Sequence, residues 1–382
     1  MNELKKLQIL NLGSNFLSGE VPDCWINFPD LSVISLGNNK FTGSLPNSLG
    51  TLTSLRSLNL RTNNLSGTIP VSLQNCETLV ALDVGENELV GNIPTWIGER
   101  FAKMMILNLR SNKFHGVFPE ELCRLTSLQI LDLADNNLSG AVPKCINNFS
   151  AMVTLNYSGL NFISYPSYSA GKFLEEALLV MKGNAVQYKA ILNLLRSMDL
   201  SENNFSGAIP IEVTDLEALR SLNLSHNNFN GRIPEDIGAM RSLEAIDFSV
   251  NKLSGEIPQS LSILTFLSYL NLSTNKLTGK IPLSTQLQSF NESCFMGNKL
   301  CGAPLLEKCP VPPDDETEGG DDNDDDDGYE VDWFYVSMAL GFVVGFWSFI
   351  GPFLVNRRWR YMYCHFLDRL GDKFGSVVRK YR

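Results

Sequence analysis

The stretch LTSLRSLNLRTNNLSGTIP at residues 52–70 decides the fold, because its pattern recurs along most of the chain. Asparagines equivalent to Asn63 follow one another at intervals of 24 residues, once of 25, with a single gap of 67. An apolar residue and a proline follow each of them in a Gly-x-apolar-Pro segment. The asparagines are Asn15, Asn39, Asn63, Asn87, Asn112, Asn136, Asn203, Asn227, Asn251 and Asn275. Such a period predicts stacked repeats rather than one globular core.

The spacing within a repeat predicts how it folds. Leu58 and Leu60 form a short strand whose leucines point inward, and one such unit cannot bury its apolar side alone. Leu60→Ala should therefore lower the free energy of unfolding by about 2–5 kcal/mol. Asn63 turns inward to satisfy backbone groups at the bend, Gly67 permits the bend and Pro70 ends the segment. The stacked strands should form a curved parallel sheet, whose inner face is the usual binding surface of a solenoid.

The Leu-x-Gly-x-Ile-Pro half of this repeat resembles the plant-type leucine-rich repeat over residues 1–285. The whole chain resembles plant receptor-like proteins of the fungal-elicitor-receptor and disease-resistance type, which have no kinase domain. The shared features are an interrupted repeat array, a cysteine-bearing cap, an acidic stretch, one membrane helix and a short tail. The resemblance implies an α/β leucine-rich-repeat solenoid followed by a single transmembrane helix.

The pattern predicts seven segments. They are six repeats and a partial one (1–156), an inserted island (157–190), four repeats (191–285), a cysteine cap (286–313), an acidic linker (314–332), a transmembrane helix (333–355) and a basic cytoplasmic tail (356–382).

The island is rich in aromatic residues, and it interrupts the register just before the last four repeats. One reading is a surface excursion packed on the solenoid, since insertions in loops cost little. The resemblance implies instead a contact for a ligand or a kinase co-receptor. The candidate contacts in the island are Tyr165, Tyr168 and Lys182.

The eight cysteines do not form a dense disulfide framework in a chain of 382 residues. The resemblance implies a disulfide between Cys301 and Cys309 in the cap. Cys123 and Cys145 lie 22 residues apart on adjacent turns. The sequence is equally compatible with a disulfide between them and with two free thiols. Cys76 occupies a leucine position and is expected to be a buried thiol. The pairing of Cys24 and Cys294 stays open.

Eight Asn-x-Ser/Thr sequons all precede residue 333, as expected of a secreted ectodomain. They are the predicted glycosylation sites: Asn64, Asn137, Asn148, Asn156, Asn204, Asn223, Asn271 and Asn291.

Residues 333–355 form an uncharged run long enough to span a bilayer. Acidic residues precede it and arginines follow it, so the positive-inside rule predicts a type I protein of the plasma membrane with the repeats outside. Ser337, Gly341 and Gly345 are spaced by four, and such a stripe lets another helix approach closely. The resemblance implies that a receptor-like kinase pairs with this stripe and with the acidic linker.

The remaining charges point to no enzyme and no nucleic-acid partner. The acidity is concentrated in residues 314–332, the repeats have no basic stripe, and no catalytic constellation, metal cluster or cofactor motif occurs. Arg61 and Arg110 are expected to protrude from the inner face, with Asp83 and Glu86 on the repeat between them. They are candidates for ligand contact or members of a stabilising charge ladder.

The predicted function is a plant immune receptor that binds an extracellular protein or peptide and signals through partner kinases. The family resemblance implies that this ligand is microbial. The alternatives are a developmental peptide co-receptor and a leucine-rich-repeat inhibitor of a secreted wall-degrading enzyme. No signal peptide is seen at the start of the sequence, so we expect a fragment of a longer receptor. A further alternative is that this short form is inert. The sequence does not identify the ligand.

Overall fold

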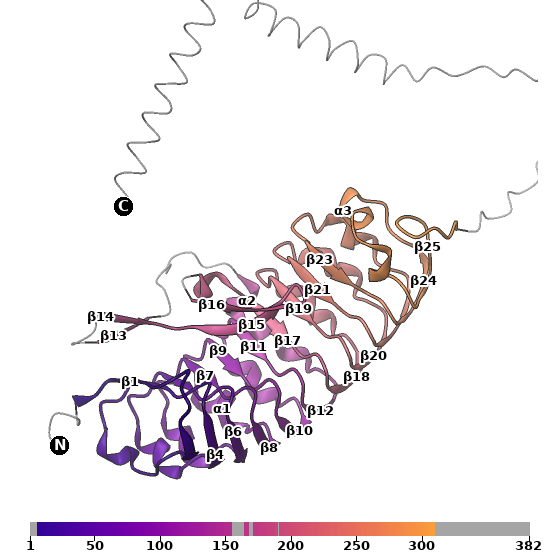
Figure 1. Ribbon diagram of the computed structural model, residues 1–382. Coiled ribbons are helices and arrows are strands. Elements are labelled where there is room, and N and C mark those ends of the chain that lie inside the picture. Colours follow the sequence, from indigo (N-terminus) through magenta and orange to yellow (C-terminus); the bar gives the residue numbers. More distant parts are fainter. Residues whose placement is uncertain (1–5, 155–163, 168–170, 190, 310–382) are drawn as a thin grey trace, which may run out of the picture. The chain divides into compact units, whose positions relative to one another are not determined.

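The computed structural model describes residues 6–154, 164–167, 171–189 and 191–309. These residues form a solenoid whose strands follow one another along an arc from β1 to β25 (Figure 1). The leucine-rich-repeat solenoid with a parallel inner sheet, predicted from the period, is confirmed.

The inner sheet has ten parallel strands, one from each repeat. Each strand pairs in register with the same three positions of the next repeat, as Ser57 pairs with Ala81. The strands are β1 (Ile9–Asn11), β3 (Val33–Ser35), β5 (Ser57–Asn59), β7 (Ala81–Asp83), β9 (Ile106–Asn108), β11 (Ile130–Asp132), β17 (Ser197–Asp199), β19 (Ser221–Asn223), β21 (Ala245–Asp247) and β23 (Tyr269–Asn271).

A second parallel sheet, which the sequence pattern did not predict, is formed by the residues that follow the regularly spaced asparagines. We expected only a bend there, but residues such as Asn64 to Gly67 are extended and pair with the next repeat. The strands are β2 (Ser18–Glu20), β4 (Lys40–Ser44), β6 (Asn64–Gly67), β8 (Glu88–Asn92), β10 (Lys113–Val117), β12 (Asn137–Gly140), β18 (Asn204–Ala208), β20 (Asn228–Gly231), β22 (Lys252–Gly255), β24 (Lys276–Lys280) and β25 (Lys299–Cys301).

Short helices follow the prolines and complete each turn. Most are single 3-10 turns, and α1 (Trp96–Arg100) lies in the one repeat of 25 residues. The others are η2 (Trp25–Asn27), η3 (Asn47–Thr51), η4 (Val71–Asn75), η5 (Glu120–Arg124), η6 (Lys144–Asn148), α2 (Ser150–Val153), η8 (Leu192–Leu194), η9 (Ile211–Asp215), η10 (Glu235–Ala239), η11 (Gln259–Ile263), α3 (Thr285–Gln288) and η12 (Glu292–Cys294).

The core is one continuous column of leucines and other apolar residues between the two sheets and the helices. Leu58 and Leu60 are 0% and 1% exposed, as the inward leucine pattern predicted. Because each repeat buries its apolar side only against its neighbours, the array is stabilised by nearest-neighbour contacts.

The asparagines of the repeat form a ladder between the sheets. Asn63 donates from Nδ2 to the carbonyls of Leu60 (3.0 Å) and Leu36 (3.2 Å), and its Oδ1 accepts the Phe41 N–H at 3.0 Å. The ladder continues across the island, where Asn203 accepts the Leu138 N–H at 2.9 Å. It satisfies buried backbone groups that the strand-to-strand bend leaves unpaired.

The island does not interrupt the stack. β11 pairs directly with β17 and β12 with β18, so the insertion leaves the solenoid and returns to it within one repeat. Its described strands are two antiparallel pairs, β13 (Ser164–Ser167) with β14 (Gly171–Leu174) and β15 (Ala177–Met181) with β16 (Asn184–Tyr188). In Figure 1 the second hairpin crosses the inner strands β9, β11 and β17.

Candidate ligand-binding surface

A second column of Asn and Asp residues, called the Asx column below, lines the inner face at the last position of the inner strands. Each side-chain oxygen accepts the N–H two residues further on, as Asn59 does from Arg61 and Asp83 from Gly85, both at 3.1 Å. Every inner strand except β3, which has Ser35, ends in such a residue. The signal, an Asn or Asp four residues before the ladder asparagine, is present in the sequence but was not used.

The residue before each ladder asparagine adopts a left-handed backbone conformation, in all ten repeats. Thr62 has φ 55° and Glu86 has φ 53°. This conformation turns the chain out of the inner strand, and the Asx contact before it compensates part of its cost. The inner face therefore repeats in its backbone while its side chains vary, which is the arrangement a recognition surface needs.

The hairpin β15–β16 is seated on this face by an apolar cluster. Ala177, Leu179 and Met181 alternate along β15 and are all buried, at 3%, 2% and 6% exposure. They pack against the first residues of inner strands, including Ile106 and Ile130. The hairpin β15–β16 is therefore packed on the solenoid, as the first reading of the island predicted.

The tip of the hairpin reaches the ninth and tenth repeats. Lys182 Nζ lies 2.9 Å from Glu244 Oε2, and Arg220 Nη1 lies 2.6 Å from the other Glu244 oxygen. Burial opposes ionisation of Glu244, but hydrogen bonds and charges from Lys182 and Arg220 lower its pKa overall. At Gly183 a Cβ atom would lie 3.4 Å from the Tyr269 ring. The predicted island contact Lys182 therefore has an intramolecular partner.

Arg61 does not protrude, contrary to the prediction. It is 6% exposed, and it donates from Nη1 to the Leu178 carbonyl of the hairpin at 3.1 Å. Its Nη2 pairs with Glu86 Oε1 at 2.5 Å, and Thr62 donates to the second Glu86 oxygen. The long side chain lies along the inner face because the Leu178 carbonyl of the hairpin accepts its hydrogen bond. No sequence pattern predicts this contact.

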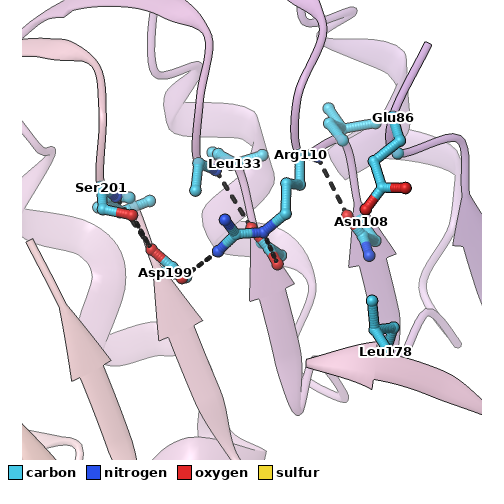
Figure 2. A network of polar contacts seen from close by, with 12 residues as sticks. Glu86, Asn108, Arg110, Leu133, Leu178, Asp199 and Ser201 are labelled. Carbon is cyan, nitrogen blue, oxygen red and sulfur yellow. Dashed lines mark hydrogen bonds and ion pairs between the residues drawn. The ribbon is translucent and has the colours of Figure 1, made fainter. Parts of the chain in front are cut away.

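Arg110 is also enclosed instead of protruding. Its side chain is 12% exposed and lies between Asp132, with Nε 2.8 Å from Oδ2, and Asp199, which Nη2 contacts. Figure 2 shows the guanidinium pointing toward Asp199 on the strand beyond the island, with Glu86 on its other side. Arg110 thereby joins the repeats that precede and follow the insertion.

Two carboxylates, Asp132 and Asp199, share this arginine. Burial and the nearby Asp199 charge raise the pKa of Asp132, more than Arg110 lowers it. Burial alone would lower the pKa of Arg110, but the charges of Asp132 and Asp199 raise it above its usual value. The cluster is a buried ion network in the described inner face.

A polar groove of about 310 Å³ lies between the hairpin and the inner strands of the first four repeats. Glu176, Leu178 and Gln187 line it from the hairpin side. Arg61 and Asp83 line it from the solenoid. Burial raises the pKa of Asp83 to about 6, and the nearby Arg61 charge offsets this only in part. The groove combines charged groups with small residues and is a candidate ligand site.

The predicted sequons fall on two different surfaces. Asn64, Asn137 and Asn204 are exposed at the same position of the second sheet, and Asn204 Nδ2 donates to Asn137 Oδ1 at 2.6 Å. Asn223 and Asn271 instead belong to the half-buried Asx column of the inner face. The remaining described sequons are also exposed, Asn148 at the end of η6 and Asn291 just before η12, whereas Asn156 lies outside the described residues.

The seven described cysteines form two disulfides and three thiols, whereas Cys364 lies outside the described residues. Cys123 and Cys145 are joined across adjacent turns, and Cys301 is joined to Cys309 in the cap. Cys24 is exposed, Cys294 is half-buried and Cys76 is buried. Burial raises the pKa of Cys76 to about 12, which leaves it an unreactive thiol.

Several predicted site residues cannot be placed in this surface. Tyr165 belongs to β13, opposite Phe173, whereas Tyr168 lies outside the described residues. The helix-pairing residues Ser337, Gly341 and Gly345 also lie outside them, as do the acidic linker and the tail. Within residues 6–309, with the gaps given above, no helix is long and apolar enough to cross a membrane.

The two sheets, the asparagine ladder and the plant-type repeat together define a leucine-rich-repeat protein. The Leucine Rich Repeat family model matches residues 6–28, 30–52, 54–76, 103–125, 127–149, 194–216, 218–240 and 266–286.

Among known proteins the chain is similar to plant receptor-like proteins, as its sequence predicted. It is 54% identical over 233 residues to receptor-like protein EIX2 of Solanum lycopersicum, covering 59% of this chain and 23% of that protein. The chain therefore spans about a quarter of the length of this relative.

Solved structures of plant receptor ectodomains have the same fold. The ectodomain of the receptor kinase GASSHO1/SCHENGEN3 of Arabidopsis thaliana, in complex with CASPARIAN STRIP INTEGRITY FACTOR 2, has a TM-score of 0.60 at 31% identity. That match covers 80% of this chain and 34% of the other. The Arabidopsis kinase HAESA, in complex with the peptide hormone IDA and the co-receptor SERK1, has a TM-score of 0.52 at 26% identity, with 79% and 51% covered.

Proposed function

We propose that the chain is part of a plant cell-surface receptor-like protein. This receptor binds an extracellular protein or peptide and signals in defence through partner kinases. The observation that carries this proposal is the island hairpin seated on the inner face beside a polar groove. A varied inner face with a rigid insertion and an open groove suits recognition of a macromolecular ligand.

The comparisons support a receptor role of this kind. EIX2 is a receptor-like protein, and the GASSHO1 and HAESA structures are those of receptor kinases, HAESA with a peptide hormone and a co-receptor. For this chain we infer a ligand at the inner face and a second kinase co-receptor at the island and the last four repeats. Tyr165, Tyr168, Lys182, Arg61 and Arg110 remain the candidate contacts, Arg61 acting through the hairpin that it binds.

The signal would pass through the membrane segment predicted at residues 333–355. We propose a single-pass type I protein of the plasma membrane, with glycosylated repeats outside. The stripe Ser337, Gly341 and Gly345 and the acidic linker would pair with a receptor-like kinase, because small residues permit close helix contact.

The test compares the full chain with variants of the stripe. The tagged chain, led by a secretion signal, is expressed in leaf cells as wild type, as Gly341→Leu with Gly345→Leu, and as Ala339→Leu with Gly351→Leu. The last pair adds nearly the same bulk, one methyl group less, off the stripe. Kinases that co-purify are identified and quantified.

We expect one receptor kinase with the wild type and the control pair, and at least tenfold less with the stripe variant, about 1.4 kcal/mol. Equal recovery with all three would contradict pairing through the stripe. The absence of any kinase would contradict the receptor proposal and favour a tethered inhibitor of a secreted enzyme.

A further inference from the structure

β16 is the outer strand of a two-stranded sheet, and its outer edge is unpaired. The turn at Lys182 and Gly183 has positive φ at both residues (54° and 73°), so Met181 and Asn184 are the first hydrogen-bonded pair. By alternation, the backbone N–H and C=O groups of Ala185 and Gln187 point away from β15. In the described part of the chain they have no hydrogen-bond partner.

The equivalent edge of β15 is occupied. The Leu178 carbonyl points away from β16 and accepts from Arg61 Nη1 at 3.1 Å, which fixes the hairpin to the solenoid by that edge. The opposite edge is therefore held in place without being used. A rigid, unpaired strand edge is a template for an extended segment of another chain.

The edge lacks the features that normally protect it. Residues 184–187 are all exposed, and the strand from Asn184 to Tyr188 contains no charge, proline or glycine. Natural proteins usually place lysine, proline or a bulge at an open edge to prevent pairing. Their absence here favours a strand that has a partner.

The groove touches β16 through Gln187, and its charge can select a side chain of that partner. Asp83, Glu86 and Glu176 line it, against Arg61. Lys189 Nζ reaches Glu176 at 3.4 Å, so three acidic groups face two basic ones, an excess of one negative charge. A basic side chain would neutralise this excess.

Gly13 and Gly37 line the groove at its first repeats, and Gln187 of β16 lines its other wall. A residue paired with Gln187 on the free edge of β16 would lie about 4.8 Å from it, which is the spacing of neighbouring strands. A long side chain of that residue can therefore extend past Gln187 into the groove.

We propose that an extended peptide segment of the ligand docks along β16 as a third strand of the island hairpin and places a lysine or arginine side chain in the groove. This inference rests on the proposed function and names the ligand chemistry that the island recognises. Main-chain hydrogen bonds to Ala185 and Gln187 supply the register, and the carboxylates supply the side-chain preference.

A display library of random peptides of about ten residues, long enough to span the strand, is the probe. It is panned on the full chain, and the enriched peptides are titrated against the wild type, Ala185→Pro, Ala185→Val and Asp83→Asn. The proline removes one outward N–H, whereas the valine changes only the side chain. Peptides N-methylated at single positions are titrated against the wild type, which needs no altered protein.

We expect enriched peptides with lysine or arginine at one position. Ala185→Pro should weaken them roughly tenfold and Ala185→Val little. N-methylation should weaken binding at every second residue only, as strand pairing requires. Asp83→Asn should reduce the preference for the basic residue over leucine.

Peptides insensitive to Ala185→Pro and to N-methylation would overturn the proposal, as would the failure of any peptide to be enriched. Concentration-dependent dimers of the wild type that Ala185→Pro abolishes would assign the edge to a second copy and also overturn it. If kinase pairing through the stripe persists in any of these cases, the docking mode fails while the receptor function stands.

Discussion

At the scale of single residues, two columns of amide and carboxylate groups hold the solenoid together. The ladder asparagines bond neighbouring repeats between the sheets, whereas the Asx column fixes each bend at the inner face. Both columns tolerate little change, because an unsatisfied buried polar group costs about 1–3 kcal/mol. Asn and Asp both occur in the Asx column, with aspartate at Asp83, Asp132, Asp199 and Asp247.

Asp83→Asn should stabilise the fold at neutral pH. Burial raises the pKa of Asp83 from 3.8 to about 6, so the folded state loses stability as pH rises through this window. The loss is up to about 3 kcal/mol, at roughly 1.4 kcal/mol for each pKa unit. Asparagine keeps the bond to Gly85 and occupies the same position in β5 and β9.

Urea unfolding of the full chain at pH 4 and at pH 7.5 measures this effect. The gain from Asp83→Asn should be present at pH 7.5 and nearly vanish at pH 4. Asp30→Asn, a change at an exposed aspartate, should alter neither. An equal gain at both pH values would show that Asp83 keeps an ordinary pKa.

At the scale of elements, the hairpin β15–β16 is held by three different interactions. The apolar residues of β15 bury against the inner strands, Arg61 binds its edge, and Lys182 contacts Glu244 at its tip. The burial dominates, because the Lys182 side chain is 41% exposed and such pairs contribute at most about 1 kcal/mol. The hairpin also requires the left-handed backbone conformation of its turn at Lys182 and Gly183.

Gly183→Val should loosen the hairpin without unfolding the repeats. Valine resists φ of 73°, and this backbone strain is the main cost because its Cβ would only be in ordinary contact with the Tyr269 ring. We expect hydrogen exchange of the β15 amides to accelerate at least tenfold, about 1.4 kcal/mol, with unchanged exchange in β5 and β19. Lys182→Asn removes the ion pair but suits the turn, so it should accelerate exchange far less. Equal effects of the two would make the ion pair the main anchor.

At the scale of the whole solenoid, the buried ion network couples the repeats on either side of the island. Arg110 lies on the fifth repeat, Asp132 on the sixth and Asp199 on the seventh. Because each repeat otherwise contacts only its neighbours, a side chain that binds two repeats away adds cooperativity to the array. The hairpin adds a second link, from Arg61 to Glu244.

Arg110→Met should separate the unfolding of the two halves. It leaves two buried carboxylates without their cation, at a cost of about 3–5 kcal/mol at the junction. We expect the wild type to unfold in one urea transition and Arg110→Met to unfold in two. Hydrogen exchange of the amides in β7 and in β21 reports the two halves separately. Arg124→Met, at a side chain 66% exposed with a 3.9 Å pair, is the control and should leave one transition. A single transition for both variants would mean that the core alone couples the halves.

The sequence by itself determined the repeat, its strand, the buried leucines and the asparagine ladder. It could do so because these features depend on contacts one period apart, which a 24-residue pattern displays directly. The Asx column was equally visible there, since its bonds join residues two apart.

Only the tertiary structure decided what Arg61 and Arg110 do and where the island lies. Leu178 is 117 residues from Arg61, and Asp199 is 89 from Arg110, so no local pattern brings them together. The second sheet arises likewise from pairing between repeats, not from the extended residues alone. Both arginines become buried because the hairpin and the neighbouring repeats supply acceptors that compensate their loss of water.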